Sequence, residues 1–162
     1  PKRPLNKLFV HDEKIVGETV DSKANRVIEQ VVSEGAEAII MASLDDIAWT
    51  TNLRTANDIS YSPMFVSYVF LSNDQRILFI DDEKLTDEVK AHLNKYNFEI
   101  KPYDAVLDFI ASLPESTRLL VDPDKVSRGL FDKVGCNAVF GGIRTKTIYH
   151  LLCSFNLFLF FQ

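Results

Sequence analysis

The spacing of apolar residues predicts an amphipathic helix early in the chain. From Asp21 onward, apolar side chains recur at steps of three and four residues: Ala24, Val27, Ile28, Val31 and Val32. Either Asp21 or Ser22 can cap this helix, and Gly35 is placed to end it. The apolar run 36–42 follows, and its length is typical of a buried strand.

A second helix is predicted directly after this strand. Ser43 is placed as its N-cap, and Asp46 stands three residues further on, which is the spacing of a capping box. The helix extends through Trp49, and a polar loop then covers residues 50–63. This part of the chain therefore places an aromatic helix residue directly before a long loop.

A β-hairpin and three further helices are predicted after that loop. Runs rich in β-branched and aromatic residues, 64–72 and 76–81, flank a turn at Asn73 and Asp74. Helices and strands then alternate, with helices over 86–96, 104–113 and 125–134 and strands over 98–103 and 118–122. Parallel neighbours need helical crossovers, whereas the hairpin supplies an antiparallel pair. The fold class is therefore predicted as α/β, with a mixed sheet of about six strands flanked by helices.

The two ends of the chain differ from the predicted domain at 21–141. Residues 1–20 contain two prolines and no sustained repeat of apolar positions, so we expect a linker or arm that enters the domain. Residues 142–162 form a divergent apolar tail, which is too short for a bilayer span of about 20 apolar residues. We expect this tail to be either a partly buried terminal element or an aberrant terminus from a truncated or misread gene.

Composition and charge exclude several classes of protein. The 162 residues suffice for one domain with an ordinary core. A net charge of −5 with scattered Lys and Arg argues against nucleic acid and membrane partners. Cys136 and Cys153 lack the spacing of a metal or redox motif, which favours a reducing, cytoplasmic location. The chain begins at Pro1 without a secretory signal, which is typical of a processed or excised fragment.

Motifs that carry catalysis or bind metal are absent from the sequence. His11, His92 and His150 are far apart and do not form a zinc-binding spacing. The sequence contains no GxSxG nucleophile elbow and no GxxxxGK phosphate-binding loop. We therefore predict that this chain supplies no catalytic residue, no metal ligand and no cofactor site.

Acidic residues after two predicted strands leave one alternative open. Asp81, Asp82 and Glu83 follow the first strand, and Asp122 and Asp124 follow the second. Carboxylates at strand ends can hold a hard cation such as Mg²⁺, as in response-regulator receiver domains. Alternatively, these acids leave the sheet and open helices, where they satisfy free backbone N–H groups. Little chain remains for the last strands of a receiver, so the second interpretation is favoured.

One ordered motif within residues 43–72 resembles a known family. Acids open a helix, IAW and NLR follow, and an Asp, a Pro and an aromatic strand complete the motif: Asp45, Asp46, Ile47, Ala48, Trp49, Asn52, Leu53, Arg54, Asp58, Pro63, Phe65, Ser67 and Tyr68. This pattern resembles the second domain of three-domain, cytosolic-type Xaa-Pro aminopeptidases (aminopeptidase P), and the similarity extends over residues 1 to about 140. The chain departs from the family at Thr55, where a Gly is usual, and in a loop about one residue longer.

The resemblance implies a creatinase/prolidase N-terminal domain-like fold with a ribonuclease H-like motif. It also implies that catalysis belongs to a following pita-bread domain, which binds two divalent metal ions, usually manganese, and releases the residue before proline. That domain is absent from this sequence, so we expect the chain alone to be inactive. Its expected role is to position its own catalytic domain and to support a homodimer.

Four residues of the motif are implied to act at an interdomain contact or at the substrate entrance. In the family, the loop after the IAW helix lies toward the catalytic domain and the neighbouring subunit. Arg54 and Asp58 would orient these neighbours, with Trp49 and Phe65 packed beneath them. Core packing and ordinary loop structure are the alternative for each residue. A stand-alone dimerisation module from a truncated isoform is the competing interpretation of the whole chain.

Overall fold

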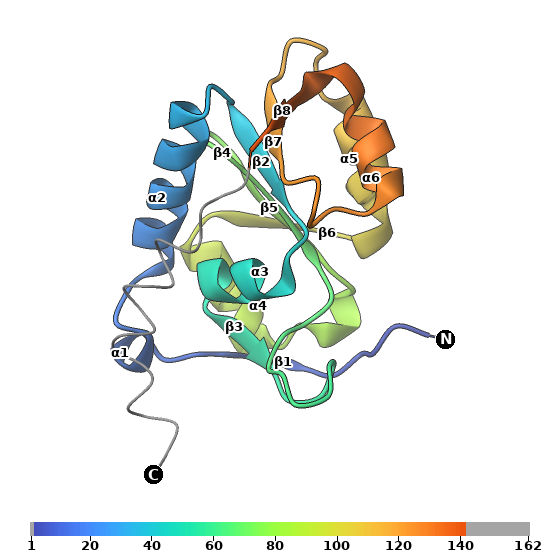
Figure 1. The fold of residues 1–162 in the computed structure, drawn as a ribbon. Helices are drawn as coiled ribbons and strands as arrows, with labels where there is room; N and C mark the ends of the chain where they lie inside the picture. The colour runs from blue at the N-terminus through green and yellow to red at the C-terminus, as the bar shows by residue number, and fades with distance from the viewer. Residues whose placement is uncertain (1, 142–162) are drawn as a thin grey trace.

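A six-stranded mixed sheet forms the centre of the domain in a computed structural model that describes residues 2–141 (Figure 1). The strand order is β6-β5-β4-β2-β7-β8. The strands are β2 (Ala38–Met41), β4 (Tyr68–Ser72), β5 (Arg76–Phe79), β6 (Phe98–Lys101), β7 (Leu119–Val121) and β8 (Ala138–Phe140). The predicted tail at 142–162, with His150 and Cys153, lies outside the described residues.

Pairing directions explain the mixed character of this sheet. β4 pairs antiparallel with both β2 and β5, so the predicted hairpin is present as β4 and β5. β2 pairs parallel with β7, β5 with β6, and β7 with β8. Each parallel pair is connected through at least one helix, as a parallel crossover requires. The predicted α/β fold class with a mixed sheet is therefore confirmed.

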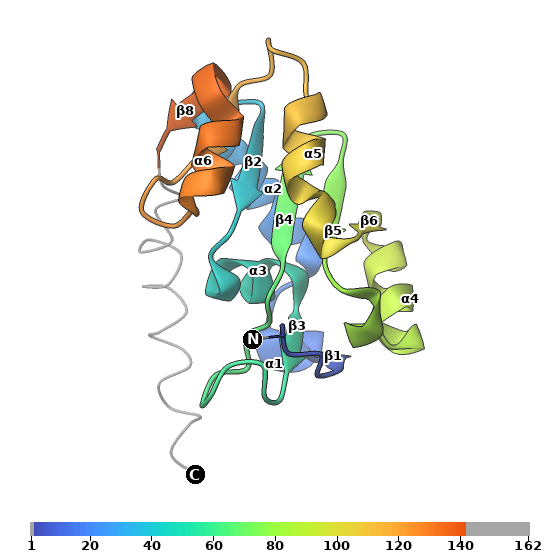
Figure 2. The same ribbon diagram turned by 90° about the vertical axis from the view of Figure 1, so that its right-hand side faces the viewer.

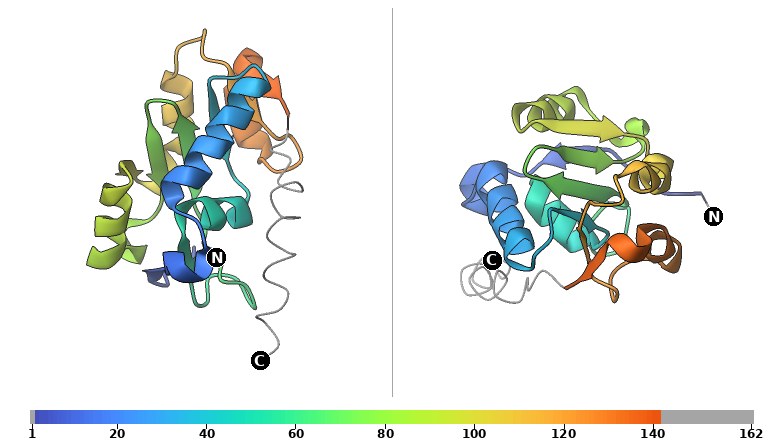
Figure 3. Two further views of the ribbon diagram at one scale, coloured as in Figure 1. Left: turned by 90° about the vertical axis from the view of Figure 1, so that its left-hand side faces the viewer. Right: turned by 90° about the horizontal axis from the view of Figure 1, so that it is seen from above.

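Helices cover both faces of the sheet (Figure 3). They are α2 (Val20–Ser33), α3 (Leu44–Thr51) and α4 (Asp87–Lys95) on one face, and α5 (Val106–Ser112) and α6 (Arg128–Val134) on the other. Side chains of β2 alternate between two apolar clusters: Ile39 and Met41 face the first group of helices, whereas Ala38 and Ile40 face the second. Because both faces are covered, the central strands are continuous apolar runs in the sequence.

A small second sheet lies at one end of the domain (Figure 2). This sheet consists of β1 (Leu8–Val10) and β3 (Leu53–Thr55), which pair antiparallel. The short helix α1 (Glu13–Val16) lies between β1 and α2 in the chain. The structure thus contains a short strand within the arm expected at 1–20 and another within the loop expected at 50–63. The sequence did not reveal them, because strands of three residues are too short to show an alternation of apolar and polar positions. The Leu8 side chain is buried and joins the first segment to the core.

One predicted N-cap residue and one predicted capping box differ from the structure, whereas Ser43 is the N-cap residue of α3 as predicted. The N-cap of α2 is Thr19, whose hydroxyl accepts a hydrogen bond from the backbone N–H of Ser22 (3.2 Å), so neither Asp21 nor Ser22 is the cap. Ser43 does precede α3, but its hydroxyl donates to the Asp45 carboxylate instead of accepting from the helix. The predicted capping box is therefore wrong.

Short 3₁₀ helices connect several of these elements. They are η1 (Asp82–Lys84), η2 (Tyr103–Ala105) and η3 (Gly135–Asn137). The acids after β5 thus belong to a tight turn that leads into α4. Within residues 2–141, no helix is both long and apolar enough to cross a membrane.

Candidate functional site

The acidic residues after β5 and β7 do not converge on one point. Both strands end at the same edge of the sheet, but β4 and β2 lie between them, which separates the two ends by about 14 Å for three strand spacings. Asp81 pairs with Arg3 (Oδ2 to Nε, 3.1 Å), and Asp122 accepts a hydrogen bond from the backbone N–H of Asp124 (3.1 Å). Among residues 2–141, no group of three or more His, Cys, Asp or Glu side chains could hold a metal ion. These residues therefore fit neither a receiver magnesium site nor the two-metal site of the family.

A small cavity lies where the chain leaves β2 and β7. Its volume is about 20 Å³, and Ser43, Asp46, Asp122 and Lys125 are among the residues that line it. Lys125 Nζ lies 3.0 Å from Asp46 Oδ2, whereas Asp46 Oδ1 is buried without a partner in the described part of the chain. Burial raises the pKa of the Asp46 carboxyl above its ordinary value despite this ion pair. The cavity has room for about one water molecule, so it cannot accept a peptide or a nucleotide.

The Asp58 carboxylate is buried and holds the loop between β3 and β4 from the inside. It forms an ion pair with Lys84, and the exposed fractions of the two side chains are 0% and 1%. The Asn6 amide donates to Asp58 Oδ1 (3.2 Å), and the Val66 backbone N–H donates to Oδ2 (3.4 Å). Lys84 also donates to the Pro4 carbonyl (3.2 Å). Asp58 therefore connects the first segment of the chain, the loop and η1.

Phe65 lies in the apolar core beneath the same loop. Its exposed fraction is 0%, and it belongs to the same cluster as Leu53 and Val69. A residue buried in this way supports the loop and presents no surface to another domain.

The Arg54 guanidinium folds back onto the end of α3. Its Nη1 donates to the carbonyls of Ala48 and Leu53, the second at 2.8 Å. Carbonyl groups at a helix C-terminus carry partial negative charge, so a cation is stabilised there. On the small sheet, Arg54 of β3 pairs in register with Phe9 of β1.

Trp49 lies against two cations of α2. Lys23 Nζ is 4.7 Å from the centroid of the indole ring, and Arg26 Cζ is 5.3 Å from it. Lys23 donates to the Trp49 carbonyl (2.9 Å) and to Asn52 Oδ1 (2.6 Å), although Lys23 is 0% exposed. Burial lowers the pKa of Lys23 to about 8. Trp49 therefore lies at a positively charged junction between α2 and α3.

The four predicted residues thus occupy two places. Trp49 and Arg54 lie together at the C-terminal end of α3, whereas Asp58 and Phe65 support the following loop from within. A role for them at an interdomain contact or a substrate entrance stays a prediction. One further residue belongs to this arrangement: Lys84, which pairs with the buried Asp58 carboxylate.

Sequence reasoning missed the lysines that hold these residues. Lys23 lies on the apolar face of α2 together with Val20 and Val27, so a charge at a buried helical position was a signal available in the sequence. No comparable pattern marks Lys84, because its partner Asp58 is 26 residues away along the chain.

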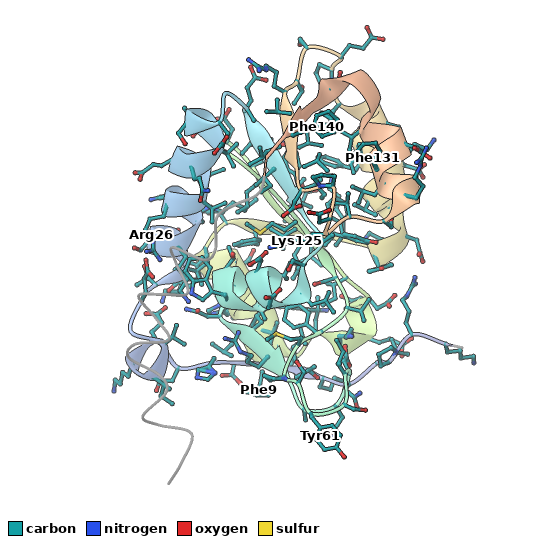
Figure 4. The ribbon with its side chains drawn as sticks, in the orientation of Figure 1. Phe9, Arg26, Tyr61, Lys125, Phe131 and Phe140 are labelled. Atoms are coloured by element: carbon teal, nitrogen blue, oxygen red, sulfur yellow. The ribbon has the colours of Figure 1, made fainter. Side chains whose placement is uncertain are left out.

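Two aromatic side chains are exposed beside the small sheet (Figure 4). Phe9 is 47% exposed, and Tyr61 is fully exposed in the loop between β3 and β4. Both line a surface hollow of about 620 Å³ whose lining residues are all uncharged. Tyr61 has a φ angle of 61°, a left-handed conformation that costs a non-glycine residue about 1–2 kcal/mol. This hollow is a candidate contact surface.

Comparisons of sequence place the chain among known proteins. The family described as Creatinase/Prolidase N-terminal domain matches residues 1–149. Aminopeptidase P2 of Arabidopsis thaliana is 39% identical over 128 residues, which are 78% of this chain and 18% of that protein. A probable Xaa-Pro aminopeptidase P of Fusarium vanettenii is 39% identical over 108 residues, which are 67% of this chain and 17% of that protein. The chain therefore spans less than a fifth of the length of these relatives.

Comparisons of structure agree with this result. An X-prolyl aminopeptidase of Caenorhabditis elegans, described as a cytosolic enzyme with a di-nuclear active site, aligns with a TM-score of 0.79 and 27% identity. The alignment covers 86% of this chain and 24% of that one. The N-terminal domain of a metallopeptidase of Corynebacterium diphtheriae aligns with a TM-score of 0.50 and 11% identity, over 76% of this chain and 98% of that one, and shows a shared fold alone.

Proposed function

The chain belongs to the Creatinase/Prolidase N-terminal domain family, and from this premise we propose that it is the non-catalytic domain of a metal-dependent Xaa-Pro aminopeptidase. In that role it positions the catalytic part of the enzyme and supports a homodimer. The observation that carries the proposal is the mismatch in coverage: the similarity spans 78% of this chain but 18% of the Arabidopsis aminopeptidase. The rest of such an enzyme would contain the reacting groups.

The distribution of candidate ligands supports this division of labour. Two divalent ions, manganese in the family, would need several carboxylate and imidazole ligands around them. Residues 2–141 contain no group of three or more such side chains that could hold a metal. The metal ions and the activated water would therefore belong to the remainder of the polypeptide, and the enzyme would be cytoplasmic like the C. elegans protein.

The surface at the C-terminal end of α3 would contact that remainder. Arg54 and the half-buried Trp49 lie there, and Asp58 and Phe65 fix the adjoining loop through buried contacts. A loop fixed in this way needs little ordering when it binds, which favours a defined interdomain geometry. The exposed Phe9 and the other residues of the uncharged hollow extend the same end of the domain.

Mixing separately purified parts tests the proposal. We would combine the 162-residue chain with Arabidopsis aminopeptidase P2 that lacks its matching 128 residues, and measure both association and release of the residue before proline with Mn²⁺ present. We expect the chain alone to be inactive, and the mixture to be more active than the truncated enzyme alone. Hydrolysis by the purified chain alone, or no association of the two parts, would contradict the proposed function.

A further inference from the structure

One side chain of the uncharged hollow lies on a strained backbone. Residues 59–62 form a turn that the Ser62 backbone N–H closes by donating to the Ile59 carbonyl (3.2 Å). Tyr61 is the third residue of this turn, and its φ angle of 61° is one that Gly or Asn usually supplies. Strained residues of this kind cluster at functional positions. The turn therefore keeps a bulky aromatic residue where a small one would be unstrained.

Contacts within the domain do not explain why Tyr61 occupies this position. Its side chain is fully exposed, and neither a hydrogen bond nor a ring contact joins it to another of the residues 2–141. Single exposed apolar residues are common, but exposure alone does not explain a residue that also strains its backbone. Tyr is enriched among the anchor residues of interfaces, because its ring buries a large area and its hydroxyl can hydrogen-bond. Tyr61 has these features of an anchor.

The base of the loop holds the turn in place. On one side of the turn, the Asp58 carboxylate pairs with Lys84 in the interior. On the other side, the Thr55 backbone N–H donates to the Pro63 carbonyl (3.0 Å). A side chain on a loop that is already ordered loses little conformational entropy when it binds. Tyr61 is therefore presented to the outside on a fixed support.

The hollow beside Tyr61 favours an uncharged occupant. A quarter of the whole chain is charged, yet none of the residues that line these 620 Å³ is. Phe9 is 47% exposed within it, and Figure 4 shows Phe9 and Tyr61 at the same end of the molecule. A charge placed in such a hollow would lose water without gaining a counter-ion, which is costly. The lining residues are Phe9, Thr55, Ala56, Asn57, Ser60, Tyr61, Ser62 and Pro63.

We propose that the uncharged hollow docks an apolar, uncharged segment of the remaining aminopeptidase polypeptide, with Tyr61 as the anchor residue. The inference rests on the proposed function, because the unmatched four-fifths of the relatives supplies the segment. Eight residues line the hollow, whereas a stable interface between separate molecules takes about 20–30 residues on each side. A segment of the same polypeptide is held nearby at an effective concentration of about millimolar, so a small contact suffices. The size of the hollow therefore favours this occupant over a second copy of the chain.

Nitration by tetranitromethane provides a local assay, because the Tyr61 ring is fully exposed. We would nitrate the 162-residue chain and a chimera in which its matching part replaces the 128 residues of Arabidopsis aminopeptidase P2, and quantify each tyrosine by mass spectrometry. Tyr61 should react in the chain alone and at least about tenfold more slowly in the chimera, where only a minor undocked state exposes it. The half-buried Tyr68 of β4 is the internal reference and should react equally in both.

Each other result of this assay counts against the proposal in a different way. Equal nitration of Tyr61 in the two proteins would overturn it. Activity then separates the two claims, because an active chimera leaves the proposed function standing, whereas a chimera no more active than the enzyme without the segment removes both. Slow nitration of Tyr61 in the chain alone would overturn the choice of partner. Slowing that grows with protein concentration would identify a second copy, and slowing at every concentration would identify residues 142–162.

Substitution of Tyr61 separates a role in binding from a role in folding. Tyr61→Gly relieves the strain, so the chain alone should keep or raise its melting temperature. The same variant should bind the truncated Arabidopsis enzyme at least about tenfold more weakly than the wild-type chain, and Phe9→Ala should weaken binding as well. Val32→Ala, at an apolar residue of α2 that is 53% exposed, is the matched control and should leave the affinity unchanged. Wild-type affinity in both hollow variants would overturn the proposal.

Discussion

Replacement of Asp58 by Asn tests the buried ion pair that holds the loop between β3 and β4. Asn keeps the shape of the side chain and one oxygen, but it removes the charge that faces Lys84. The Lys84 side chain is 1% exposed, so its ammonium group would remain in the interior without a counter-ion. Removal of one partner from a buried pair costs about 3–5 kcal/mol, and we expect a loss of this size in the free energy of unfolding.

The expected loss arises from burial, and the chain offers a matched control for this reasoning. Arg128 and Asp132 of α6 form an ion pair whose side chains are 86% and 55% exposed. Asp132→Asn makes the same chemical change in solvent, where such pairs contribute little. Lys84→Met alone should leave the buried Asp58 carboxylate without a counter-ion, and it should also lower the free energy of unfolding. The double variant of Asp58 and Lys84 should therefore lose less than the sum of the two single losses.

Urea unfolding, followed by Trp49 fluorescence and far-ultraviolet circular dichroism at pH 7, measures these free energies. The free energy of unfolding of a domain of this size is about 5–15 kcal/mol. An Asp58→Asn variant can therefore stay folded in water while its loss of stability is measured. A loss below about 1 kcal/mol, or one equal to that of Asp132→Asn, would refute the conclusion that this pair holds the loop.

Three further predictions concern the core, a protonation equilibrium and backbone strain. Phe65→Ala removes a fully buried ring and should cost about 3–5 kcal/mol in urea unfolding; a loss under 1 kcal/mol would count against core packing. The pKa of Lys23 is about 8 in the folded chain against an ordinary 10.5, so the unfolded state binds more protons between these values. Stability should therefore rise with pH in that window, by up to about 1.4 kcal/mol per unit, and Lys23→Met should lack this rise; parallel curves for the two proteins would contradict it. Tyr61→Gly should hold or raise stability by about 1 kcal/mol, because Gly adopts a positive φ without strain, and a clearly lower melting temperature in calorimetry would disprove this.

Elements with several apolar positions could be predicted from the sequence, and so could the apolar run of β7, whereas three other short strands could not. α2 and the β4–β5 hairpin contain enough apolar residues to show a period, and both are present near their predicted positions. β1, β3 and β8 have three residues each, so no alternation distinguishes them from loops. Their formation depends on distant partners, as in the pairing of Leu8 with Thr55.

The candidate site was predictable only as a set of residues. The motif marks Trp49 and Arg54, but their cationic neighbour Arg26 is placed by the packing of α2 on α3. The motif likewise marks Asp58 without indicating that its carboxylate points inward to Lys84. Spacing along the chain reports periodicity within one element, whereas these contacts join separate elements.

A chimeric enzyme tests the central claim most directly. The matching 128 residues of Arabidopsis aminopeptidase P2 would be replaced by the corresponding part of this chain, and hydrolysis of an Xaa-Pro peptide would be measured with Mn²⁺. The account predicts a rate within about tenfold of the parent enzyme, which is a difference of about 1.4 kcal/mol, and a far lower rate when the segment is deleted. A chimera that folds like its parent but has no more activity than the deletion would contradict the account.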